Sequence, residues 1–295
     1  MRTTLAVEPA TFRPLRLRPA EFARFAEFVK QELGINLTIE KAPMLEGRLS
    51  RRMRELEMTS ATEYTDYLFH SPNASEEKLE FINSITTNKT DFFREPKHFE
   101  YLVNAVVPQW CEASHEGPFK LWCAGCSSGE EPYSLARVLT DFAQRTPGFD
   151  FALLATDVST RVLDHARSGI YDHARVDPVP LPMRRQYLMR SRVTGSQSVR
   201  IAPALRRKIS FQRLNFMEDD YSVRTQFDVI FFRNVLIYFE KAVQEQVVCK
   251  IVKNLKPGGC LFIGHSESLA GLNVPLDALG AATFRKRSPR RGAKG

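Results

Sequence analysis

The 295-residue sequence has no run of about 18 consecutive apolar residues, and its first residues lack the pattern of a signal peptide. Its five cysteines form an odd and scattered set, which does not suit a disulfide framework. These absences argue against a membrane-spanning protein and against a disulfide-rich secreted one. We therefore expect a cytoplasmic protein without membrane insertion.

Phosphate-binding motifs are also absent from the most distinctive stretch, LWCAGCSSGEEPYSLA at 121–136. A Walker loop ends in Gly-Lys-Ser/Thr, and a dinucleotide loop needs three glycines where this one has Gly125 and Gly129. Glu130 and Glu131 would oppose a phosphate, but they favour a positively charged ligand. Compared with a nucleoside triphosphate or a dinucleotide, S-adenosylmethionine fits this stretch best, because it carries an ammonium and a sulfonium and no phosphate.

A zinc site is not indicated either. No second Cys-x-x-Cys or His-x-x-x-His pair exists to complete a site with Cys123 and Cys126. We predict no metal, and we expect both thiols to pack in the core, with a redox pair as the alternative.

Acidic residues are the scarcer charged group, since 34 Asp and Glu face 42 Lys and Arg, for a net charge of +8. Such an excess suits nucleic acid, anionic lipid or an acidic protein partner. Part of it lies in residues 286–295, which we expect to form a basic disordered tail. The rest includes the cluster RLSRRMR at 48–54.

Apolar spacing divides the chain into a helical part and an α/β part. Helical periods predict an all-helical N-terminal domain at 18–70 and a helical connector at 71–90. From 91 to 285, short apolar runs alternate with helical patterns, which is typical of an α/β domain with a mainly parallel sheet. Within it, alternating residues at 183–213 predict a small inserted antiparallel β subdomain, with Ile209 and Phe211 among its strands.

An acidic residue ends the second predicted strand, in LLATDVS. In doubly wound sheets such a residue accepts hydrogen bonds from ribose hydroxyls, so we expect Asp157 to bind the ribose of the cofactor. The alternatives are that Asp157 caps the following helix and that Glu131 forms a capping box with Ser128.

Several stretches, in this order along the chain, resemble the CheR-type chemoreceptor glutamate methyltransferases. They cover about residues 20–285 and read TNKTDFFRE (87–95), CSSGEEPYS (126–134), ATDVS (155–159), ARSGIY (166–171), FRNVLIYF (232–239), LKPGG (255–259) and GHSES (264–268). The Cys-Ala-Gly-Cys loop departs from the family, where small apolar residues are more usual. The resemblance implies a Rossmann-like S-adenosylmethionine-dependent methyltransferase domain with an inserted small antiparallel β subdomain, preceded by an all-helical domain.

The resemblance also implies the residues of the site. Glu131 would hold the methionine ammonium and Asp157 the ribose. Of the two catalytic residues, Arg94 would border both the cofactor and the reacting carboxylate, and Tyr238 would face the methyl group. The remaining residues would border the cofactor, with S-adenosylhomocysteine as the product: Asn88, Thr90, Asn215, Phe216, Arg233 and Asn234. The alternatives are an ion pair of Arg94 with Glu95 or Asp91, a core position for Tyr238, and a turn at His265.

The implied substrate is a glutamate side chain on chemoreceptor cytoplasmic helices. Arg48, Arg51 and Arg52 share one face of a helix and would dock on such acidic helices, although a solvated face is the alternative. Arg200, in the predicted insert, would bind a receptor C-terminal peptide, as some members of the family do. We expect a monomer that binds no nucleic acid. The alternatives are a nucleic-acid or small-substrate methyltransferase and a non-catalytic binding module.

Overall fold

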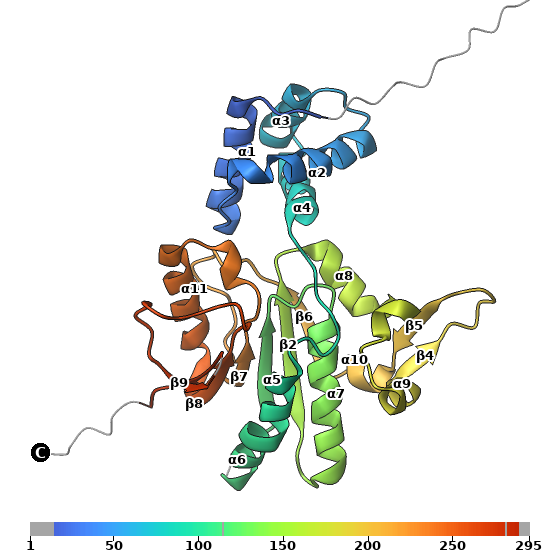
Figure 1. Ribbon diagram of the computed structural model, residues 1–295, viewed down its shortest axis with the longest axis vertical. Coiled ribbons are helices and arrows are strands. Elements are labelled where there is room, and N and C mark those ends of the chain that lie inside the picture. Colours follow the sequence, from blue (N-terminus) through green and yellow to red (C-terminus); the bar gives the residue numbers. More distant parts are fainter. Residues whose placement is uncertain (1–14, 114, 281, 289–295) are drawn as a thin grey trace, which may run out of the picture. The chain divides into compact units, whose positions relative to one another are not determined.

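The computed structural model describes residues 15–113, 115–280 and 282–288, which belong to two compact units (Figure 1). The first unit runs to Ile85 and the second begins at Thr86, except that the short segment Glu32–Asn36 belongs to the second. The predicted boundaries differ, because helix α4 (Ala74–Ile85) belongs to the first unit and not to a connector at 71–90.

The described chain also continues beyond the predicted boundary at residue 285. Lys286 ends the last strand, and the Nε atom of Arg287 pairs with Asp277 Oδ1 at 2.8 Å. The rest of the predicted tail, 289–295, lies outside the described residues.

The first unit is helical, as the apolar periods predict. Its third helix begins with a side-chain cap: Ser60 Oγ accepts a hydrogen bond from Glu63 N at 3.1 Å, and the Glu63 carboxylate accepts one from Thr59 N at 3.4 Å. The helices of this unit are α1 (Pro19–Leu33), η1 (Ile39–Lys41), α2 (Ala42–Glu55), α3 (Ala61–His70) and α4. Phe25, Leu45 and Tyr64, none of them exposed, are part of its apolar interior.

A buried ion pair joins α2 to α4. Arg52 donates from Nε and Nη2 to the two carboxylate oxygens of Glu77, at 3.0 and 2.7 Å. The buried Tyr64 hydroxyl donates to the same carboxylate at 2.7 Å, and burial raises the pKa of Tyr64 above its ordinary value. Since Glu77 is 2% exposed, this pair satisfies a charge that water cannot reach.

The second unit contains a seven-stranded sheet in the order β6-β2-β1-β7-β8-β10-β9. Neighbouring strands are parallel from β6 to β8, while β10 and β9 are antiparallel, which confirms the mainly parallel sheet. Its strands are β1 (Phe119–Ala124), β2 (Phe151–Asp157), β6 (Ile209–Arg213), β7 (Phe227–Phe231), β8 (Leu255–Phe262), β9 (Leu276–Gly280) and β10 (Thr283–Lys286).

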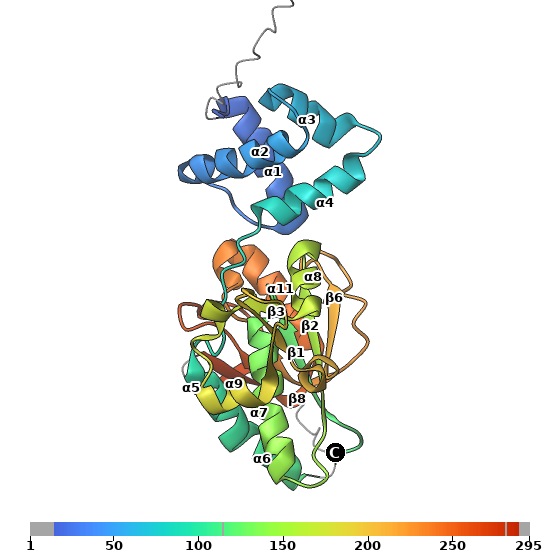
Figure 2. The same ribbon diagram turned by 90° about the vertical axis from the view of Figure 1, so that its right-hand side faces the viewer.

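Both faces of this sheet are covered, which explains the nearly continuous apolar strands. Leu121 and Cys123 of β1 pack with residues of α5 and α7 in one cluster, while Trp122 and Ala124 pack with α11 in the other. Figures 1 and 2 show the sheet between these helices. All helices of the second unit, in chain order, are α5 (Pro96–Tyr101), η2 (Leu102–Val106), α6 (Val107–Glu112), α7 (Glu130–Arg145), α8 (Thr160–Ser168), η3 (His173–Val176), α9 (Leu181–Tyr187), α10 (Pro203–Arg206), η4 (Leu236–Tyr238) and α11 (Lys241–Lys253) among the described residues.

A separate three-stranded antiparallel sheet confirms the inserted subdomain but corrects its bounds. Its order is β3-β5-β4, with β3 (Ile170–Asp172), β4 (Leu188–Arg190) and β5 (Ser198–Ile201). The expected strand at Ile209 and Phe211 is wrong as part of the insert, because it is β6, which pairs in parallel with β2. The insert therefore starts earlier, at β3, and ends before β6.

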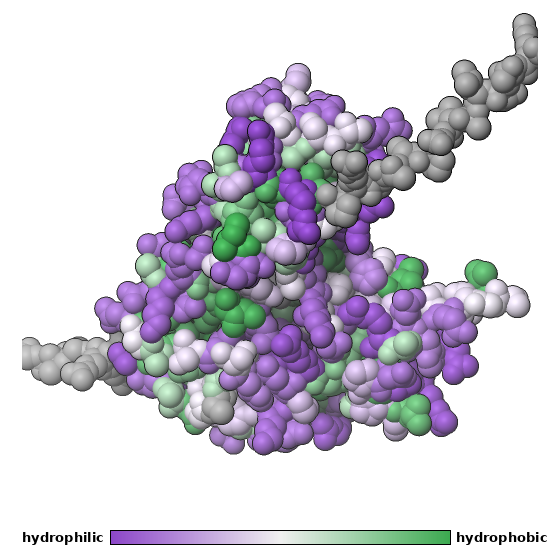
Figure 3. Space-filling model, turned by 45° about the horizontal axis from the view of Figure 1, so that its top comes forward, coloured by the Kyte–Doolittle hydropathy of each residue, from purple (hydrophilic) through white to green (hydrophobic). Residues whose placement is uncertain are grey.

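Within the described residues, none of the helices is both long and apolar enough to cross a membrane. The face shown in Figure 3 is mostly hydrophilic, with hydrophobic residues in small separate groups. Three large exposed hydrophobic residues, Ile170, Met189 and Val193, belong to the small sheet and its turn.

We predict that Arg52→Ala destabilises the helical unit by about 3–5 kcal/mol, because it leaves the buried Glu77 carboxylate without its cation. Arg51→Ala is the matched control, since the neighbouring Arg51 is exposed and its loss should change stability by about 0.5 kcal/mol or less. Urea unfolding followed by circular dichroism measures both. Equal effects of the two substitutions would contradict a structural role for the pair.

Candidate functional site

The glycine loop between β1 and α7 lies at the carboxyl edge of the sheet. Gly125 and Gly129 have φ angles of 84° and 100°, in the region that favours glycine. A Cβ atom on Gly125 would lie 2.5 Å from Val235 Cγ2, and one on Gly129 would lie 2.7 Å from Tyr171 Oη. The loop is therefore closely packed on both sides and tolerates no side chain at either glycine.

Asp157 ends β2 beside this loop and is 8% exposed. Its carboxylate accepts hydrogen bonds from the backbone N–H groups of Ser127, at 2.8 Å, and Ser159, at 3.0 Å. Burial raises the pKa of Asp157 above its ordinary value, although these backbone bonds oppose the rise. The alternative role as a helix cap is wrong, because Ser159 is the N-cap residue of α8.

Arg233, immediately beyond β7, lies between two carboxylates. Its Nη1 atom is 2.9 Å from Glu131 Oε2, and its Nη2 atom is 3.0 Å from Glu95 Oε2. Nη2 also donates to the carbonyl oxygen of Arg94 at 2.6 Å. The Arg233 side chain is fully buried, so this double ion pair joins the first turn of α7 to the loop before α5.

The two thiols of the loop pack in the core, as predicted. Cys123 and Cys126 are free and buried, and burial raises the pKa of each well above its ordinary value. Cys123 Sγ also donates to Glu131 Oε1 at 3.2 Å. Glu131 is thus held on one side by Arg233 and on the other by Cys123, and not by a capping box, because the N-cap residue Gly129 makes no side-chain cap.

The segment from Asn88 to Arg94 reaches the same loop through its backbone. The carbonyl oxygen of Asn88 accepts from Ser127 Oγ at 3.0 Å, and that of Thr90 accepts from Arg175 Nη2 at 3.0 Å. Arg94 itself is exposed and forms no ion pair with Asp91 or Glu95 among the described residues.

Phe216 lies near the opposite side of the glycine loop, since its Cε2 atom would be 3.9 Å from a Cβ on Gly125. Asn215 differs from the expectation in having partners of its own. Its Nδ2 donates to the carbonyl oxygen of Glu32 at 2.6 Å, and its Oδ1 accepts from Met217 N at 3.0 Å. Asn215 thus ties the Glu32–Asn36 segment to the end of β6.

Asn234 has an unusual backbone, with φ 59°, and its buried Nδ2 atom has no hydrogen-bond partner in the described part of the chain. Glu267 stabilises this conformation by accepting from the backbone N–H groups of Asn234, at 2.8 Å, and Gly264, at 2.7 Å. Tyr238 is half-buried in η4, so it is not a fully buried core aromatic. The Asn234 Nδ2 atom lies close to Gly264, and an unpaired buried amide is a donor that a ligand could use.

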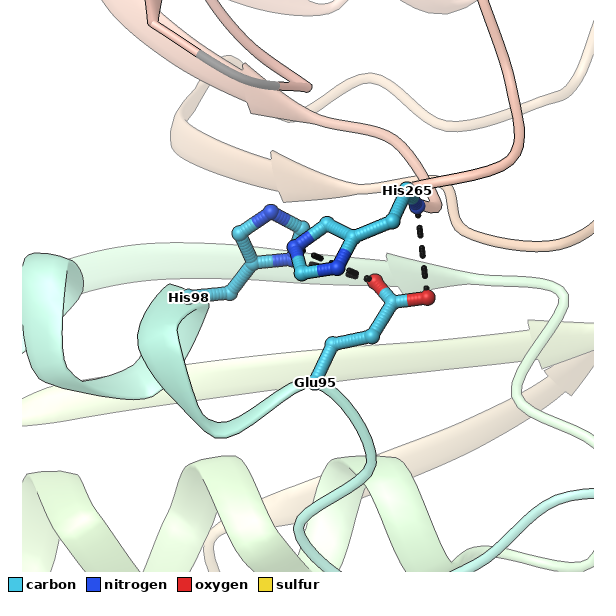
Figure 4. Close-up of side chains that lie close together, drawn as sticks. All are labelled: Glu95, His98 and His265. Carbon is cyan, nitrogen blue, oxygen red and sulfur yellow. Dashed lines mark hydrogen bonds and ion pairs between the residues drawn. The ribbon is translucent and has the colours of Figure 1, made fainter.

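The sequence did not indicate that Glu95 pairs with Arg233 beside the site. Glu95 has φ 56° and accepts from His265 N at 3.2 Å, and its carboxylate faces the rings of His98 and His265 (Figure 4). Burial would raise the pKa of Glu95, but Arg233 and the His265 N–H outweigh it and lower that pKa. His265 does lie in the predicted turn. The signals in the sequence were that Glu95 ends the family stretch TNKTDFFRE and that His265 lies in the stretch GHSES.

The predicted docking arginines differ in how they are used. Arg52 is committed to Glu77, and the Nη1 atom of Arg48 donates to the carbonyl oxygen of Ile85. Of the three on α2, Arg51 is the exposed one. Arg200 is exposed on β5, where its Nε atom donates to Ser168 O at 3.1 Å.

The loop suits a cationic cofactor and not a phosphate. Glu131 and Asp157 converge on the loop, and each carboxylate has four lone-pair positions, so neither is saturated by the contacts above. The unpaired Asn234 Nδ2 adds a donor. Two carboxylate acceptors and one amide donor fit the ammonium, ribose and adenine groups of S-adenosylmethionine.

Comparison with known proteins gives the same assignment. Residues 20–86 match the all-alpha domain of the CheR methyltransferases, and residues 88–284 match their SAM-binding domain. The chain is 38% identical over 270 residues to the chemotaxis protein methyltransferase of Escherichia coli (strain K12), which covers 92% of each chain. It is 35% identical over 270 residues to that of Borreliella burgdorferi, with 90% of this chain and 94% of the relative covered.

Similarity to solved structures is weaker. A carbon methyltransferase, DszA, aligns with a TM-score of 0.34 and 16% identity over 83% of this chain and 51% of that chain, which is too low to support any detail. The family models and the relatives suffice, and they confirm the predicted resemblance: this chain belongs to the CheR methyltransferases, and its cofactor is S-adenosylmethionine.

Proposed function

We propose that this protein methylates glutamate side chains of chemoreceptor cytoplasmic helices, forming methyl esters and releasing S-adenosylhomocysteine. The observation that carries the proposal is the convergence of Glu131 and Asp157 on a glycine loop, with the exposed Arg94 attached to the same group of residues through Arg233. The relatives are named chemotaxis protein methyltransferases, which supports chemoreceptors as the substrates.

The cofactor roles follow from charge and position. Glu131 binds the ammonium, since an anion beside a cationic group strengthens a hydrogen bond. Asp157 accepts from the ribose hydroxyls. Phe216 lies against the adenine and Asn215 beside it, while Asn234 uses its unpaired amide. Asn88 and Thr90 border the cofactor from the segment that contacts Ser127 and Arg175.

The reaction needs no general base. A glutamate side chain has an ordinary pKa of about 4.3, so it is already an anionic nucleophile at neutral pH. The cofactor supplies a methyl group on a positively charged sulfur. Arg94 orients the substrate carboxylate with its planar guanidinium, and Tyr238 donates one hydrogen bond to it. Arg94 must not bind the carboxylate too tightly, because negative charge is lost in the transition state.

We predict that methyl groups transferred from radiolabelled cofactor to receptor membranes are released as methanol by mild base, because the product is an ester. A base-stable product would contradict esterification and favour methylation of nitrogen.

Arg94→Ala should lower kcat much more than it weakens cofactor binding, since the work of Arg94 is alignment of the carboxylate. Unchanged turnover in Arg94→Ala would remove Arg94 from the proposed mechanism.

We predict that Glu131→Gln and Asp157→Asn each weaken S-adenosylmethionine binding by about 1.5–3 kcal/mol, the value of a hydrogen bond to a charged group. Asp164→Asn is the control, because Asp164 is exposed on α8 and pairs with Arg167 on the same helix. Isothermal calorimetry measures all three, with circular dichroism to confirm folding. Normal affinity in both site variants would refute the assignment.

The exposed face of the small sheet suits a receptor peptide. Arg200 on the middle strand is directly opposite Ile170 on one side and Met189 on the other, and all three are exposed. A peptide with an acidic side chain next to an apolar one could pair its carboxylate with Arg200 and pack its apolar side chain on Ile170 or Met189. Strand β4 is an edge strand, so its backbone is available for an added strand. Tethering a receptor there raises the local enzyme concentration at the methylation sites.

We predict that peptides copied from the C-termini of receptors of the same organism bind this sheet, and that Arg200→Glu weakens their binding. Arg145→Glu, the same change at an exposed position of α7, is the control. If no receptor tail binds, or if Arg200→Glu behaves like the control, tethering at this sheet is wrong.

We also predict that Arg51→Glu slows receptor methylation and flattens its salt dependence, because it opposes docking on acidic helices. Arg145→Glu is the control for this charge reversal as well.

A further inference from the structure

Three side chains with metal-binding atoms meet beside the candidate cofactor site without being part of it (Figure 4). Glu95 and His98 come from the start of α5, and His265 comes from the turn after β8. One nitrogen or oxygen from each residue lies within 4.8 Å of the other two. The methyl-transfer reaction proposed above assigns no role to either histidine.

The distances are close to those of a metal site. Glu95 Oε2 lies 3.5 Å from His98 Nδ1 and 3.9 Å from His265 Nε2. Ligand atoms about 2.1 Å from a tetrahedral zinc ion are separated by about 3.4 Å. A small movement of these side chains toward one another would therefore bring their ligand atoms to the spacing of a tetrahedral zinc site. His265 is able to make it, because its side chain is 45% exposed, whereas His98 is held in the interior at 4%.

The environment also leaves room for further ligands. His98 and His265 line a cavity of about 500 Å³, together with Lys97, Tyr101 and Thr283. Two imidazoles and one carboxylate on one side of an open cavity leave the remaining coordination positions to water. Imidazole ligands select zinc and related transition ions over magnesium or calcium, which prefer oxygen.

Two nearby cationic side chains oppose a bound cation, since Lys97 lines the same cavity and Arg233 Nη2 is 3.0 Å from Glu95 Oε2. The opposition from Arg233 is partial for two reasons. Glu131 pairs with Nη1 of the same guanidinium and offsets its charge. The Glu95 carboxylate also keeps lone pairs beyond those used by Arg233 and the His265 N–H.

We propose that Glu95, His98 and His265 form a binding site for one divalent transition-metal ion of the zinc type. The competing explanation is that the two imidazoles simply form a hydrogen-bonded and packed cluster with Glu95. Their rings do pack edge to face, with centroids 4.7 Å apart. The two explanations differ in whether a metal binds and in which atoms hold it.

The test uses the full chain, without an affinity tag and stripped of metal by a chelator. Zn²⁺ is titrated by calorimetry and Co²⁺ by its visible absorption. We expect one ion per chain at micromolar concentration, and His265→Ala should weaken binding about tenfold or more. His70→Ala is the control, because His70 is an exposed histidine at the end of α3. It should leave the affinity unchanged.

X-ray absorption of the zinc-loaded protein identifies the ligand atoms. Nitrogen and oxygen neighbours without sulfur support the site and exclude binding at the cysteines. Three results would overturn the proposal: no binding of either ion at micromolar concentration, sulfur in the zinc shell, or equal affinity in His265→Ala and wild type. Because the His265 ring packs on His98, circular dichroism of His265→Ala is needed to confirm that the variant is folded.

Discussion

A buried arginine between two carboxylates is the interaction on which the rest of the site depends. The Arg233 side chain has no exposed surface, and its guanidinium pairs with Glu131 through Nη1 and with Glu95 through Nη2. The cost of burying such a charge is offset only when partners lie on several sides, and removal of one partner typically costs about 3–5 kcal/mol. Three segments distant in sequence, at the end of β7, the start of α7 and the start of α5, are therefore fixed relative to one another.

The double ion pair of Arg233 also determines the charge around the cofactor loop. One arginine faces Glu131 and Glu95, while Asp157 lies at the end of the adjacent strand without a cationic partner among the described residues. The balance around the loop is negative, which suits a cationic ligand. Burial raises the pKa of Asp157, so new hydrogen bonds from ligand hydroxyls would stabilise its charged form. The same position would repel a pyrophosphate.

The sequence predicts those features that local patterns encode, and it misses those that depend on distant residues. The alternation of short apolar runs with helical patterns, the strand that ends at Asp157 and the glycine loop are predicted correctly, because each is a short continuous pattern. Alternation at Ile209 and Phe211 indicated a strand, but period two does not distinguish a parallel edge strand from an antiparallel insert. The contacts of Glu95 with Arg233 and His265 could not be predicted either, because folding alone brings these segments together.

The Cys-Ala-Gly-Cys loop differs from the family at Cys123, and two properties of this side chain account for the difference: it is small enough for the core, and it can donate a hydrogen bond to Glu131. Cys123 is fully buried in a central strand, where a larger or strongly polar group would not fit, yet its thiol still donates to Glu131 at 3.2 Å. Thiols are small, largely apolar and weak donors, so this contact orients the carboxylate without neutralising it. The strong partner of Glu131 is Arg233, and the weak one leaves lone pairs for an ammonium. The acidic loop thus stays available to a cation in a protein whose net charge is +8.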